Sequence, residues 1–378
     1  MIRLTRLSLA DFRNYPALTW RPGARVSVVT GPNGSGKTNL LEAVSLLVPG
    51  RGLRGARTAD LARRAGGGRW AVAARFDTPD GRMDVGTGTA GEGPEDRRGF
   101  RLDGVAPRSQ AAIAARLAAV WLTPQMDRLF LEGASGRRRF LDRLAFALEP
   151  GHARQVAAHD TATVSRNRLL AGGGTDAAWL AAVEDSIARH AVAATAARAG
   201  LVARLNAALA AGAAAPFPAA RLALLGPIAE QLAAGPALAA EDWVRATLAA
   251  SRARDAAAGS ATVGAHRADF ALADAETGLA AAAASTGQQK ALLIGVVLGH
   301  AALIAEVRGV APLLLLDEPA VHLDEGRRRA LFAALARLPA QALLTGTDAE
   351  TFAPLHGVAE GLRAGGGILV PDPLFPAI

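Results

Sequence analysis

The sequence predicts a mixed α/β fold whose sheet core is built from both ends of the chain, with an α-helical arm inserted between them. One observation is a glycine-rich loop at 31–38 that follows a strand and opens a helix. A second is a hydrophobic strand at 313–316 that ends in Asp317 and Glu318. A third is helical apolar periodicity across 137–258. The expected parts are, in chain order, a first head segment at 1–114, the arm at 115–255 and a second head segment at 256–378.

The first head segment is predicted to consist of strands around the glycine-rich loop. Residues 2–9 alternate between apolar and polar side chains, which is typical of a half-buried strand. Residues 25–30 form a valine-rich strand that leads into the loop, and 37–48 continue as a helix with leucines at helical spacing. Shorter strands are expected at 70–76, 82–87 and 99–102, between turns rich in Gly, Pro and Asp.

The middle of the chain is predicted to be helical, at 137–148, 152–170, 177–210 and 237–258. In the third helix an apolar residue recurs every three or four positions from Leu180 to Leu209, and Arg198 falls off this stripe. A stripe along a helix of about 50 Å usually packs against another helix. We expect 237–258 to be the partner, joined through the Pro- and Gly-containing segment 212–236.

The last segment is predicted to alternate between strands and helices. Strands are expected at 261–272, 312–316 and 341–346, and helices at 287–307 and 325–337. Residues 291–305 are apolar, but His300 and the flanking charges indicate a buried helix, so no membrane span is expected.

The composition favours an acidic partner and excludes thiol chemistry. The formal net charge is +8, the sequence pI is about 11.1, and arginine far outnumbers lysine. One interpretation is a DNA partner, because Lys and Arg release counterions on contact with phosphates; the other is a coding bias toward arginine. The absence of cysteine excludes disulfides and suits a reducing cytoplasm, where we expect the protein to act.

The glycine-rich loop has the form G-x-x-x-x-G-K-[ST], which binds nucleotide phosphates. Its glycines let backbone N–H groups face the phosphates, and the helix N-terminus adds a positive dipole end. Lys37 is expected to contact the β- and γ-phosphates, and Thr38 a Mg²⁺ ion. The expected binding residues are Gly31, Pro32, Asn33, Gly34, Ser35, Gly36, Lys37 and Thr38.

The strand at 313–316 has the form of a Walker B strand. Four leucines bury it and bring Asp317 to its C-terminal end, where the carboxylate can hold Mg²⁺ through water. Glu318 is placed to polarise the attacking water, so Glu318 and Lys37 are the expected catalytic residues. An ordinary buried strand that ends in a capping Asp-Glu is the alternative, and the phosphate loop argues against it.

A third motif, S-T-G-Q-Q-K at 285–290, opens a helix about 250 positions after Lys37. Its hydroxyl, backbone N–H groups and helix N-terminus suit a phosphate. Because the chain already has one phosphate cradle, we expect Ser285, Gly287 and Gln288 to serve the nucleotide of another subunit. As an isolated motif, it is equally well a helix cap.

The motifs together resemble a known family. The loop G-P-N-G-S-G-K-T-N-L-L-E-A, the signature S-T-G-Q-Q-K, the strand L-L-L-L-D-E-P and the pair Leu323-Asp324, divided by a helical insertion, resemble the ABC-type heads of the SMC family. Within that group the chain is similar to the RecF family of recombination mediators over nearly its whole length. The more specific likeness lies outside the ATPase core, at 11–15, 137–142, 165–168 and 264–269.

The resemblance implies an ATP-dependent homodimer, in which each ATP lies between the phosphate loop of one protomer and Ser285 of the other. It implies DNA binding at single-strand/double-strand junctions and gapped duplex, and weak DNA-dependent ATP hydrolysis that reopens the dimer. It further implies co-operation with RecR and RecO in loading RecA. RecF and SMC heads carry arginines near ATP or DNA after the first helix, and among Arg51, Arg54 and Arg57 we expect Arg54; a solvated arginine run is the alternative.

Three positions depart from the family pattern. Thr347 stands where ABC proteins often carry a switch histidine, and a threonine cannot act as a cation or general base at pH 7, which is consistent with slow turnover. Gln125 lies near the place of the glutamine that coordinates Mg²⁺ in such heads, in a weakly matching segment. Ala265 stands where RecF relatives usually have proline.

For several other side chains the sequence leaves a functional and a structural role open. Phe12 and Tyr15 could stack near adenine or belong to the core, and His322 could lie at the site or be a loop residue. His266 could mark an ATP- or interface-linked loop or have a structural role at a strand end. Residues 137–139 could contact DNA or form a solvent-exposed basic helix N-terminus.

Three other classes of protein share part of the pattern. In the ATPase subunit of a transporter, the phosphate loop and signature lie far closer together in the chain. A nuclease-bearing SMC-like ATPase needs an acidic cluster in a further domain, and few residues follow Asp348. A clamp that binds ATP without hydrolysis fits the missing switch histidine, but such a clamp does not need Glu318.

Overall fold

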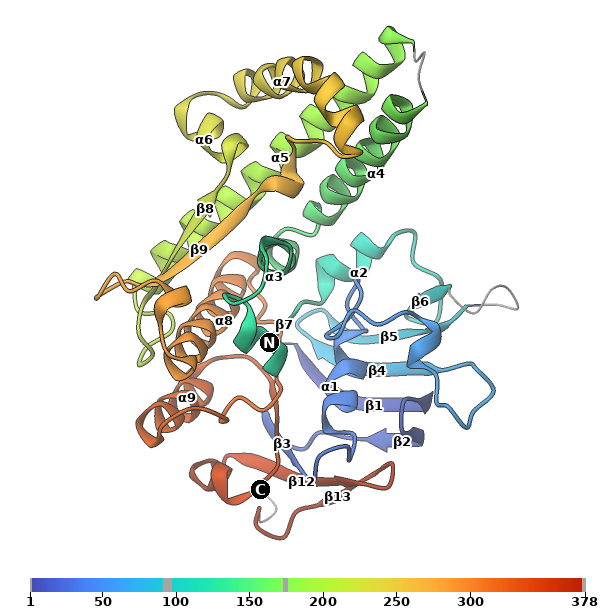
Figure 1. The fold of residues 1–378 in the computed structure, drawn as a ribbon. Helices are drawn as coiled ribbons and strands as arrows, with labels where there is room; N and C mark the ends of the chain where they lie inside the picture. Colours follow the sequence, from blue (N-terminus) through green and yellow to red (C-terminus); the bar gives the residue numbers. More distant parts are fainter. Residues whose placement is uncertain (1, 91–96, 173–175, 376–378) are drawn as a thin grey trace. The chain divides into compact units, whose positions relative to one another are not determined.

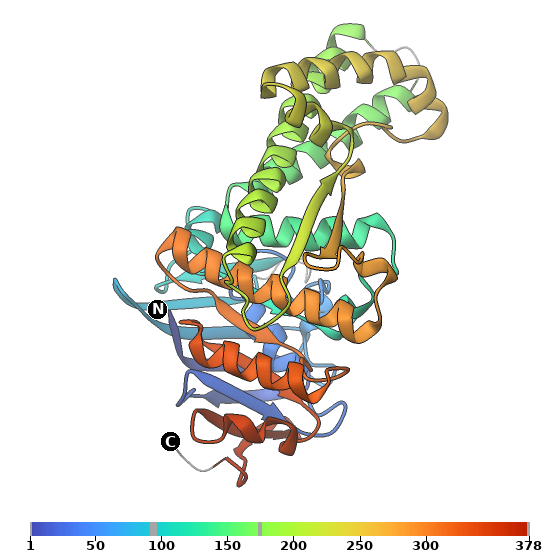
Figure 2. The ribbon, with the colours of Figure 1, turned by 90° about the vertical axis from the view of Figure 1, so that its left-hand side faces the viewer.

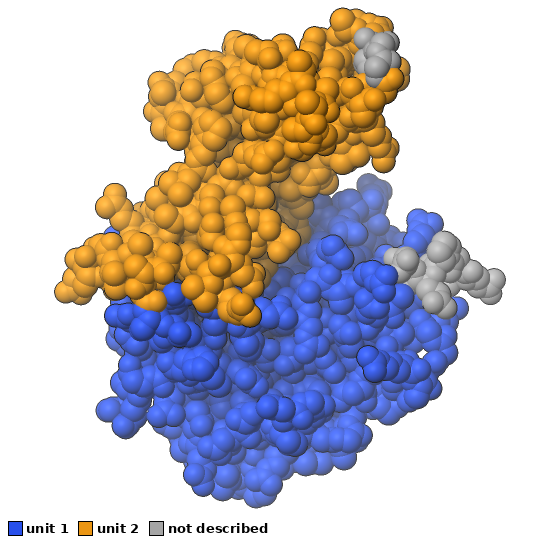
Figure 3. Space-filling view, viewed as in Figure 1, with its two compact units in different colours: residues 1–127, 208–219, 285–378 blue, residues 128–207, 220–284 orange. Residues whose placement is uncertain are grey.

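The structure divides into two compact units (Figure 3). The computed structural model describes residues 2–90, 97–172 and 176–375. The first unit, which we call the head, comprises 1–127, 208–219 and 285–378; the second, which we call the arm, comprises 128–207 and 220–284. The predicted mixed α/β fold, with a head built from both chain ends and an inserted helical arm, is confirmed. The predicted domain limits at 114 and 255 stay a prediction.

An antiparallel five-stranded sheet forms one layer of the head, in the order β2-β1-β4-β5-β6 (Figure 1). The alternation at the N-terminus buries Leu4, Leu7 and Leu9, and a bulge between Leu4 and Arg6 accommodates the spacing of three. The strands are β1 (Arg3–Phe12), β2 (Tyr15–Trp20), β4 (Ala71–Thr78), β5 (Gly81–Thr89) and β6 (Arg98–Leu102).

A six-stranded sheet, in the order β13-β12-β3-β11-β10-β7, forms the second layer of the head. All neighbours are parallel except β12 and β13. The sequence predicts helix across 115–255, and the structure differs at β7, which pairs with β10. The strands are β3 (Val26–Thr30), β7 (Ala119–Leu122), β10 (Leu313–Leu316), β11 (Ala342–Gly346), β12 (Ala359–Gly365) and β13 (Ile368–Pro371).

The helices of the head cover both faces of the six-stranded sheet. Helix α1 lies between the two sheets, and α8 and α9 lie on the opposite face (Figures 1 and 2). By length and composition α8 is apolar enough to cross a membrane, but 78% of its most apolar stretch is buried, as in the core helix of a folded protein. The helices are α1 (Lys37–Ser45), α2 (Gln110–Arg116), α8 (Thr286–Arg308) and α9 (Glu325–Arg337), with 3-10 turns η1 (Ala59–Leu61), η2 (Pro124–Arg128) and η5 (Glu350–Leu355).

The arm is helical, as predicted, but also contains a two-stranded antiparallel sheet, β8-β9. The segment 212–236 is expected to be a connection, and the structure places β8 and α6 within it. The strand expected at 261–272 begins only at Asp269, after a 3-10 turn. The elements are α3 (Ala134–Leu148), α4 (His152–Ala171), α5 (Ala177–Ala210), β8 (Ala220–Leu225), α6 (Pro227–Ala234), α7 (Ala237–Ala258), η3 (Ala265–Arg267), β9 (Asp269–Asp274) and η4 (Ala281–Ala283).

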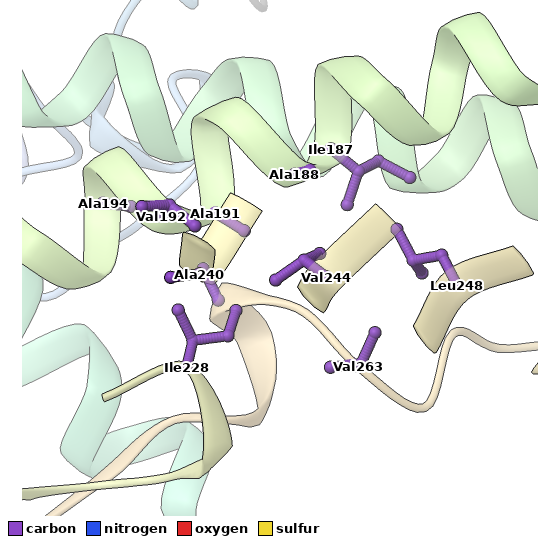
Figure 4. Close-up of a cluster of buried hydrophobic side chains, with 11 residues drawn as sticks. Ile187, Ala188, Ala191, Val192, Ala194, Ile228, Ala240, Val244, Leu248 and Val263 are labelled. Atoms are coloured by element: carbon purple, nitrogen blue, oxygen red, sulfur yellow. The ribbon is translucent and has the colours of Figure 1, made fainter. Parts of the chain in front are cut away.

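The apolar stripe of α5 packs against α7, as the periodicity predicts. Ile187 and Ala191 of α5 meet Val244 and Leu248 of α7 in one buried cluster, to which Ile228 of α6 contributes (Figure 4). Alanines occupy many stripe positions, so the two helices can approach closely. The long helix is therefore stabilised by side-chain packing in addition to its own backbone hydrogen bonds.

A fully buried arginine joins three helices of the arm. Arg166 of α4 is 0% exposed, and all three of its guanidinium nitrogens donate: Nε to Glu184 Oε1 at 2.9 Å, Nη1 to Asp255 Oδ2 at 2.8 Å and Nη2 to Leu248 O at 2.8 Å. Glu184 lies on α5, and Asp255 and Leu248 lie on α7. Because every guanidinium nitrogen has a partner and two of the partners are carboxylates, the charge is tolerated in the interior.

A second buried arginine, Arg198, lies off the apolar stripe of α5, as predicted, but it is not in solvent. Its guanidinium makes a bidentate pair with Asp142 at 2.7 and 2.9 Å and donates to Ala265 O at 2.6 Å. Burial alone would raise the pKa of Asp142, but hydrogen bonds from His152 and Arg198 outweigh it and hold that pKa below its ordinary value. Periodicity records only apolar positions, so it cannot find such a pair.

We expect the substitution Arg166→Met to lower the free energy of unfolding of the arm by about 3 kcal/mol, because it leaves the buried carboxylate of Asp255 without its ion-pair partner and removes one of the two arginines of Glu184. Arg252→Met is the matched control, since Arg252 also pairs with Glu184 but its side chain is 32% exposed; about 1 kcal/mol or less is expected. Urea unfolding of the full chain measures both. Equal losses for the two variants would contradict this account of Arg166.

Candidate nucleotide site

The glycine-rich loop at 31–38 adopts a conformation that only glycine accommodates easily. Gly31, Gly34 and Gly36 have φ of 144°, 81° and 106°. A Cβ on Gly36 would lie 2.3 Å from Asn14 Nδ2, so a side chain there would displace Asn14 from its position. Ser35 Oγ is buried without a hydrogen-bond partner among the described residues. A phosphate, which offers several acceptor oxygens, suits this cradle.

Lys37 begins α1 and is held against the loop that precedes it. Its ammonium donates to Gly31 O at 2.8 Å and to Pro32 O at 3.0 Å, and the residue is 4% exposed. The carbonyls fix the charge beside the backbone that forms the cradle. Its predicted contact with the β- and γ-phosphates, and the predicted binding roles of Asn33 and the rest of the loop, stay predictions.

Asp317 joins the two chain ends. Its Oδ1 accepts hydrogen bonds from Thr38 Oγ1 at 2.9 Å and from Thr345 Oγ1 at 2.7 Å. β10 delivers this carboxylate from a completely buried strand, and Asp317 is itself 4% exposed. The structure therefore brings together the two residues that the sequence predicts as Mg²⁺ ligands, Thr38 and Asp317.

The donor set fits Mg²⁺, which prefers oxygen ligands and keeps several waters. Thr38 and Asp317 supply one hydroxyl and one carboxylate, and a nucleotide would supply phosphate oxygens. Among residues 2–90, 97–172 and 176–375 there is no group of three or more His, Asp or Glu side chains that could hold a metal alone. A metal here would depend on the nucleotide.

Glu318 follows Asp317 in a left-handed backbone conformation, with φ of 49°. A non-glycine residue adopts this region only when its surroundings hold it there. One such contact is the hydrogen bond from Glu318 N to Thr345 Oγ1 at 3.0 Å. Thr345 thus positions both acidic residues, a role that the sequence does not reveal.

The turn at 11–15 supports the glycine-rich loop through hydrogen bonds to the loop backbone. Asn14 Nδ2 donates to Ser35 O at 3.2 Å, and Tyr15 Oη donates to Gly36 O at 3.1 Å. Burial raises the pKa of Tyr15 to about 12, so the phenol keeps its proton. Phe12 and Tyr15 are both 0% exposed, which agrees with the core interpretation.

A buried carboxylate on α1 gathers two arginines. Glu42 is 1% exposed, makes a bidentate pair with Arg13 at 2.8 and 2.9 Å, and receives Arg54 Nη1 at 3.4 Å. Arg54 also donates to Asn39 Oδ1 at 2.7 Å, one residue after Thr38. Arg54 is thus fixed beside the helix of the phosphate loop, whereas Arg57 pairs with Asp60. The sequence gives no sign of Glu42, because it lies in an ordinary helical pattern.

The signature residues form the N-terminus of α8. Ser285 is the N-cap: its Oγ accepts from Gln288 N at 3.4 Å, and Gln288 Oε1 accepts from Ser285 N at 2.9 Å. Ser285, Thr286 and Gln288 are exposed. The motif is therefore a helix cap, and its exposure leaves it accessible to another molecule. Its predicted role at a partner's nucleotide stays a prediction.

A cavity of about 280 Å³ lies next to Glu318 in the head. Thr345, Thr347 and His322 line it together with Glu318. Thr347 and Glu318 thus line one cavity, and a role of Thr347 at the switch position stays a prediction. His322 has φ of 65° in the loop after β10.

The structure answers in part whether the remaining candidate residues have a functional or a structural role. Arg137 makes a bidentate pair with Asp269 at 2.8 and 2.7 Å, so its charge is compensated within the arm. The ring of His266 lies against that of His159, with centroids 5.4 Å apart and the planes tilted by 34°, and burial lowers the pKa of both, which indicates a structural role. Gln125 is exposed in the 3-10 turn η2, and its predicted role at Mg²⁺ stays a prediction.

Comparison with known proteins identifies relatives over nearly the whole chain. The family described as "RecF/RecN/SMC N terminal domain" matches residues 3–360. The chain is 46% identical over 374 residues to a "DNA replication and repair protein RecF" from Mesorhizobium japonicum, covering 97% of each chain. It is 45% identical over 372 residues to the protein of the same name from Brucella suis, covering 97% of this chain and 96% of that one.

Solved structures show the same fold at lower identity. A structure of the recombination mediator protein RecF-ATP in the RecFOR pathway matches with a TM-score of 0.83, 21% identity and 98% coverage of both chains. An SmcHead bound to the C-winged helix domain of ScpA matches with a TM-score of 0.54 and 15% identity, covering 97% of this chain and 95% of that one.

We expect Gly36→Ala to lower the free energy of unfolding by about 3 kcal/mol, because the new Cβ would both meet Asn14 and require a left-handed conformation. Gly34→Ala is the control: it has the strain, with φ of 81°, but no atom within 4 Å of the Cβ, so about 1 kcal/mol is expected. Combined with Asn14→Ala, Gly36→Ala should cost less than the sum of the single changes. Urea unfolding measures this, and strict additivity would disprove the clash.

Proposed function

The chain belongs to the RecF family within the RecF/RecN/SMC group, and from that premise we propose that it is an ATP-dependent DNA-binding protein of replication and recombinational repair. It binds ATP, dimerises on DNA and, with RecO and RecR, promotes RecA loading at single-stranded gaps. Slow ATP hydrolysis resets the dimer. The observation that carries the proposal is the bond between Thr38 and Asp317, 279 positions apart, which joins the phosphate loop and the Walker B strand in one site.

The proposed ATPase chemistry follows from the positions of the side chains. Loop N–H groups and Ser35 bind the phosphates, and Lys37 exchanges its carbonyl partners for β- and γ-phosphate oxygens. Mg²⁺, held through Thr38 and Asp317, would supply charge neutralisation for the departing diphosphate. Glu318 orients the attacking water and accepts its proton. Thr347 can only hydrogen-bond at neutral pH, which accounts for slow turnover.

The proposed homodimer rests on the exposed N-terminus of α8. A helix of 23 residues presents a positive dipole end, with Ser285 and Thr286 exposed at its N-terminus. The head already has one phosphate cradle at the start of α1. The second cradle is therefore assigned to the ATP of the partner protomer, as the family resemblance implies.

The proposed DNA partner is supported by charge. The whole chain carries a formal charge of +8, and the segment between α1 and β4 is rich in arginine, with Arg51, Arg64 and Arg69 exposed. A solvated arginine run would also give this pattern. Gapped duplex, RecR, RecO and RecA follow from the resemblance, as does a cytoplasmic location.

A second candidate is a clamp that binds ATP without hydrolysing it. Thr347 favours it, because the site has no switch histidine at that position. Glu318 argues against it, because a binding protein does not need an acidic residue held in a strained conformation beside the metal ligand.

The dimer is tested by sedimentation velocity with and without ATP. The wild type should be monomeric alone and dimeric with ATP. Lys37→Ala should lose ATP binding, and Glu318→Gln should bind ATP and remain dimeric after the wild type has dissociated. Ser285→Asp should bind ATP but stay monomeric, because a carboxylate would repel the partner's phosphates.

Aspartate is chosen at position 285 because it caps a helix as well as serine does, so α8 keeps its N-cap. Thr286→Ala is the matched control and should dimerise. If Ser285→Asp dimerises like the wild type, or if the wild type dimerises without ATP through another face, the composite site is wrong.

DNA binding is expected to require ATP and to weaken steeply with salt. The logarithm of the association constant should fall linearly with the logarithm of salt concentration, with a slope of about −0.9 for each phosphate contacted. Fluorescence anisotropy with gapped and linear duplex, each with and without ATP, measures both effects. A flat salt dependence, or equal affinity of Ser285→Asp and wild type for gapped DNA with ATP, would count against the proposal.

A further inference from the structure

The second turn of α8 contains a buried positive charge. Lys290 is 1% exposed, in a helix whose following residues are apolar and buried. Transfer of an ammonium from water to the interior is unfavourable unless it is paired and hydrogen-bonded. The partners of Lys290 therefore show what the charge does.

The ammonium of Lys290 links three segments of the head. It donates to Glu318 O at 3.1 Å and to Asp127 Oδ2 at 3.2 Å. Asp127 belongs to η2, the turn that also contains Gln125. Asp127 Oδ1 is buried without a hydrogen-bond partner among the described residues, so this carboxylate depends on Lys290. One side chain of the signature helix thus contacts both the Walker B end and the turn after β7.

The contact falls on the strained residue of the site. Glu318, with φ of 49°, is held on both sides: its N–H donates to Thr345 Oγ1 at 3.0 Å, and its carbonyl accepts from Lys290. Together these bonds fix the orientation of both peptide groups of Glu318. They thereby fix the direction of the Cα–Cβ bond, the point from which the side chain reaches the site.

A second contact joins the same two segments. A Cβ on Gly287 would lie 2.9 Å from His322 O, so the backbone of the signature passes directly against the loop after Glu318. His322 also has a positive φ, of 65°. The first two turns of α8 therefore support both strained residues of the segment 318–322.

We propose that Lys290 is a positioning residue, which ties the signature helix to the backbone of Glu318 and so couples the partner-facing Ser285 to hydrolysis. The inference rests on the proposed ATPase function and deepens it. Ser285 and Lys290 lie on one rigid helix only five positions apart, so a shift of α8 when Ser285 meets a phosphate moves the ammonium that holds Glu318. A buried ion pair that only stabilises the fold is the competing explanation.

The test compares Lys290→Met, which removes the donor, with Lys290→Arg, which keeps it. For Lys290→Met we expect at least a tenfold loss of kcat for ATP hydrolysis with KM unchanged within about twofold, and ATP-dependent dimers that still form. Lys290→Arg should recover most of the lost kcat. Because a smaller folded fraction would also lower the apparent kcat at unchanged KM, kcat is expressed per ATP-binding site, counted by equilibrium ATP binding.

Asp127→Asn serves as the stability control, because it weakens the ion pair but leaves the bond from Lys290 to Glu318 O. It should lower the melting temperature while kcat stays within about twofold. If Lys290→Met does not fold, Lys290→Met/Asp127→Leu replaces the ion pair by apolar side chains and should still lose kcat relative to Asp127→Asn.

The proposal is overturned if Lys290→Met or the double variant hydrolyses ATP like the wild type, or if Asp127→Asn loses as much kcat as Lys290→Met. Glu318→Gln is measured in parallel. A wild-type rate for Glu318→Gln would show that the proposed catalytic role of Glu318 is wrong. A low rate for Glu318→Gln with a wild-type rate for Lys290→Met would reject this inference alone.

Discussion

The carboxylate of Asp317 is the point on which the head depends, because hydroxyls from both Thr38 and Thr345 donate to it. β3 and β10 are not neighbours in the sheet, since β11 lies between them. The register aligns Gly346 of β11 with Thr30 of β3, so the phosphate loop and the Walker B end meet across the end of β11. Parallel strands place their carboxyl ends at the same edge of the sheet. Thr38 and Asp317 therefore lie within hydrogen-bond distance although 279 positions separate them in the sequence.

The five-stranded sheet supports the phosphate loop at the carboxyl edge of the six-stranded sheet. Its first turn, at 11–15, contributes Asn14 and Tyr15 to the backbone of the glycine-rich loop, and Arg13 to Glu42 on the following helix. The amide group of Asn14 occupies the space that a side chain on Gly36 would need. The lysine and glycines of the loop motif therefore depend on a turn that lies before the loop in the chain.

The sequence predicts best those elements whose signals are local. α5 and α7 match their predicted limits because apolar periodicity and flanking Pro or Gly mark them. β7, β8 and β12 escape prediction because they are short or contain Gly and Arg, and pairing with distant strands decides their conformation. The motif residues Lys37, Thr38, Asp317 and Glu318 are found at one edge, but Thr345, Glu42 and Lys290 are not predictable, since their roles depend on partners far along the chain.

The buried charges of Arg166 and Lys290 are compensated differently, and the difference bears on the role of Lys290. In the arm, each guanidinium nitrogen of Arg166 donates a hydrogen bond, two of them to carboxylates and one to a carbonyl. The pair of Lys290 with Asp127 is less complete, because one carboxylate oxygen has no hydrogen-bond partner in the part of the chain that the structure describes, and the ammonium also donates to the carbonyl of Glu318. A pair selected for stability alone would resemble that of Arg166. The bond to a strained catalytic backbone is therefore the feature of Lys290 that stability does not explain.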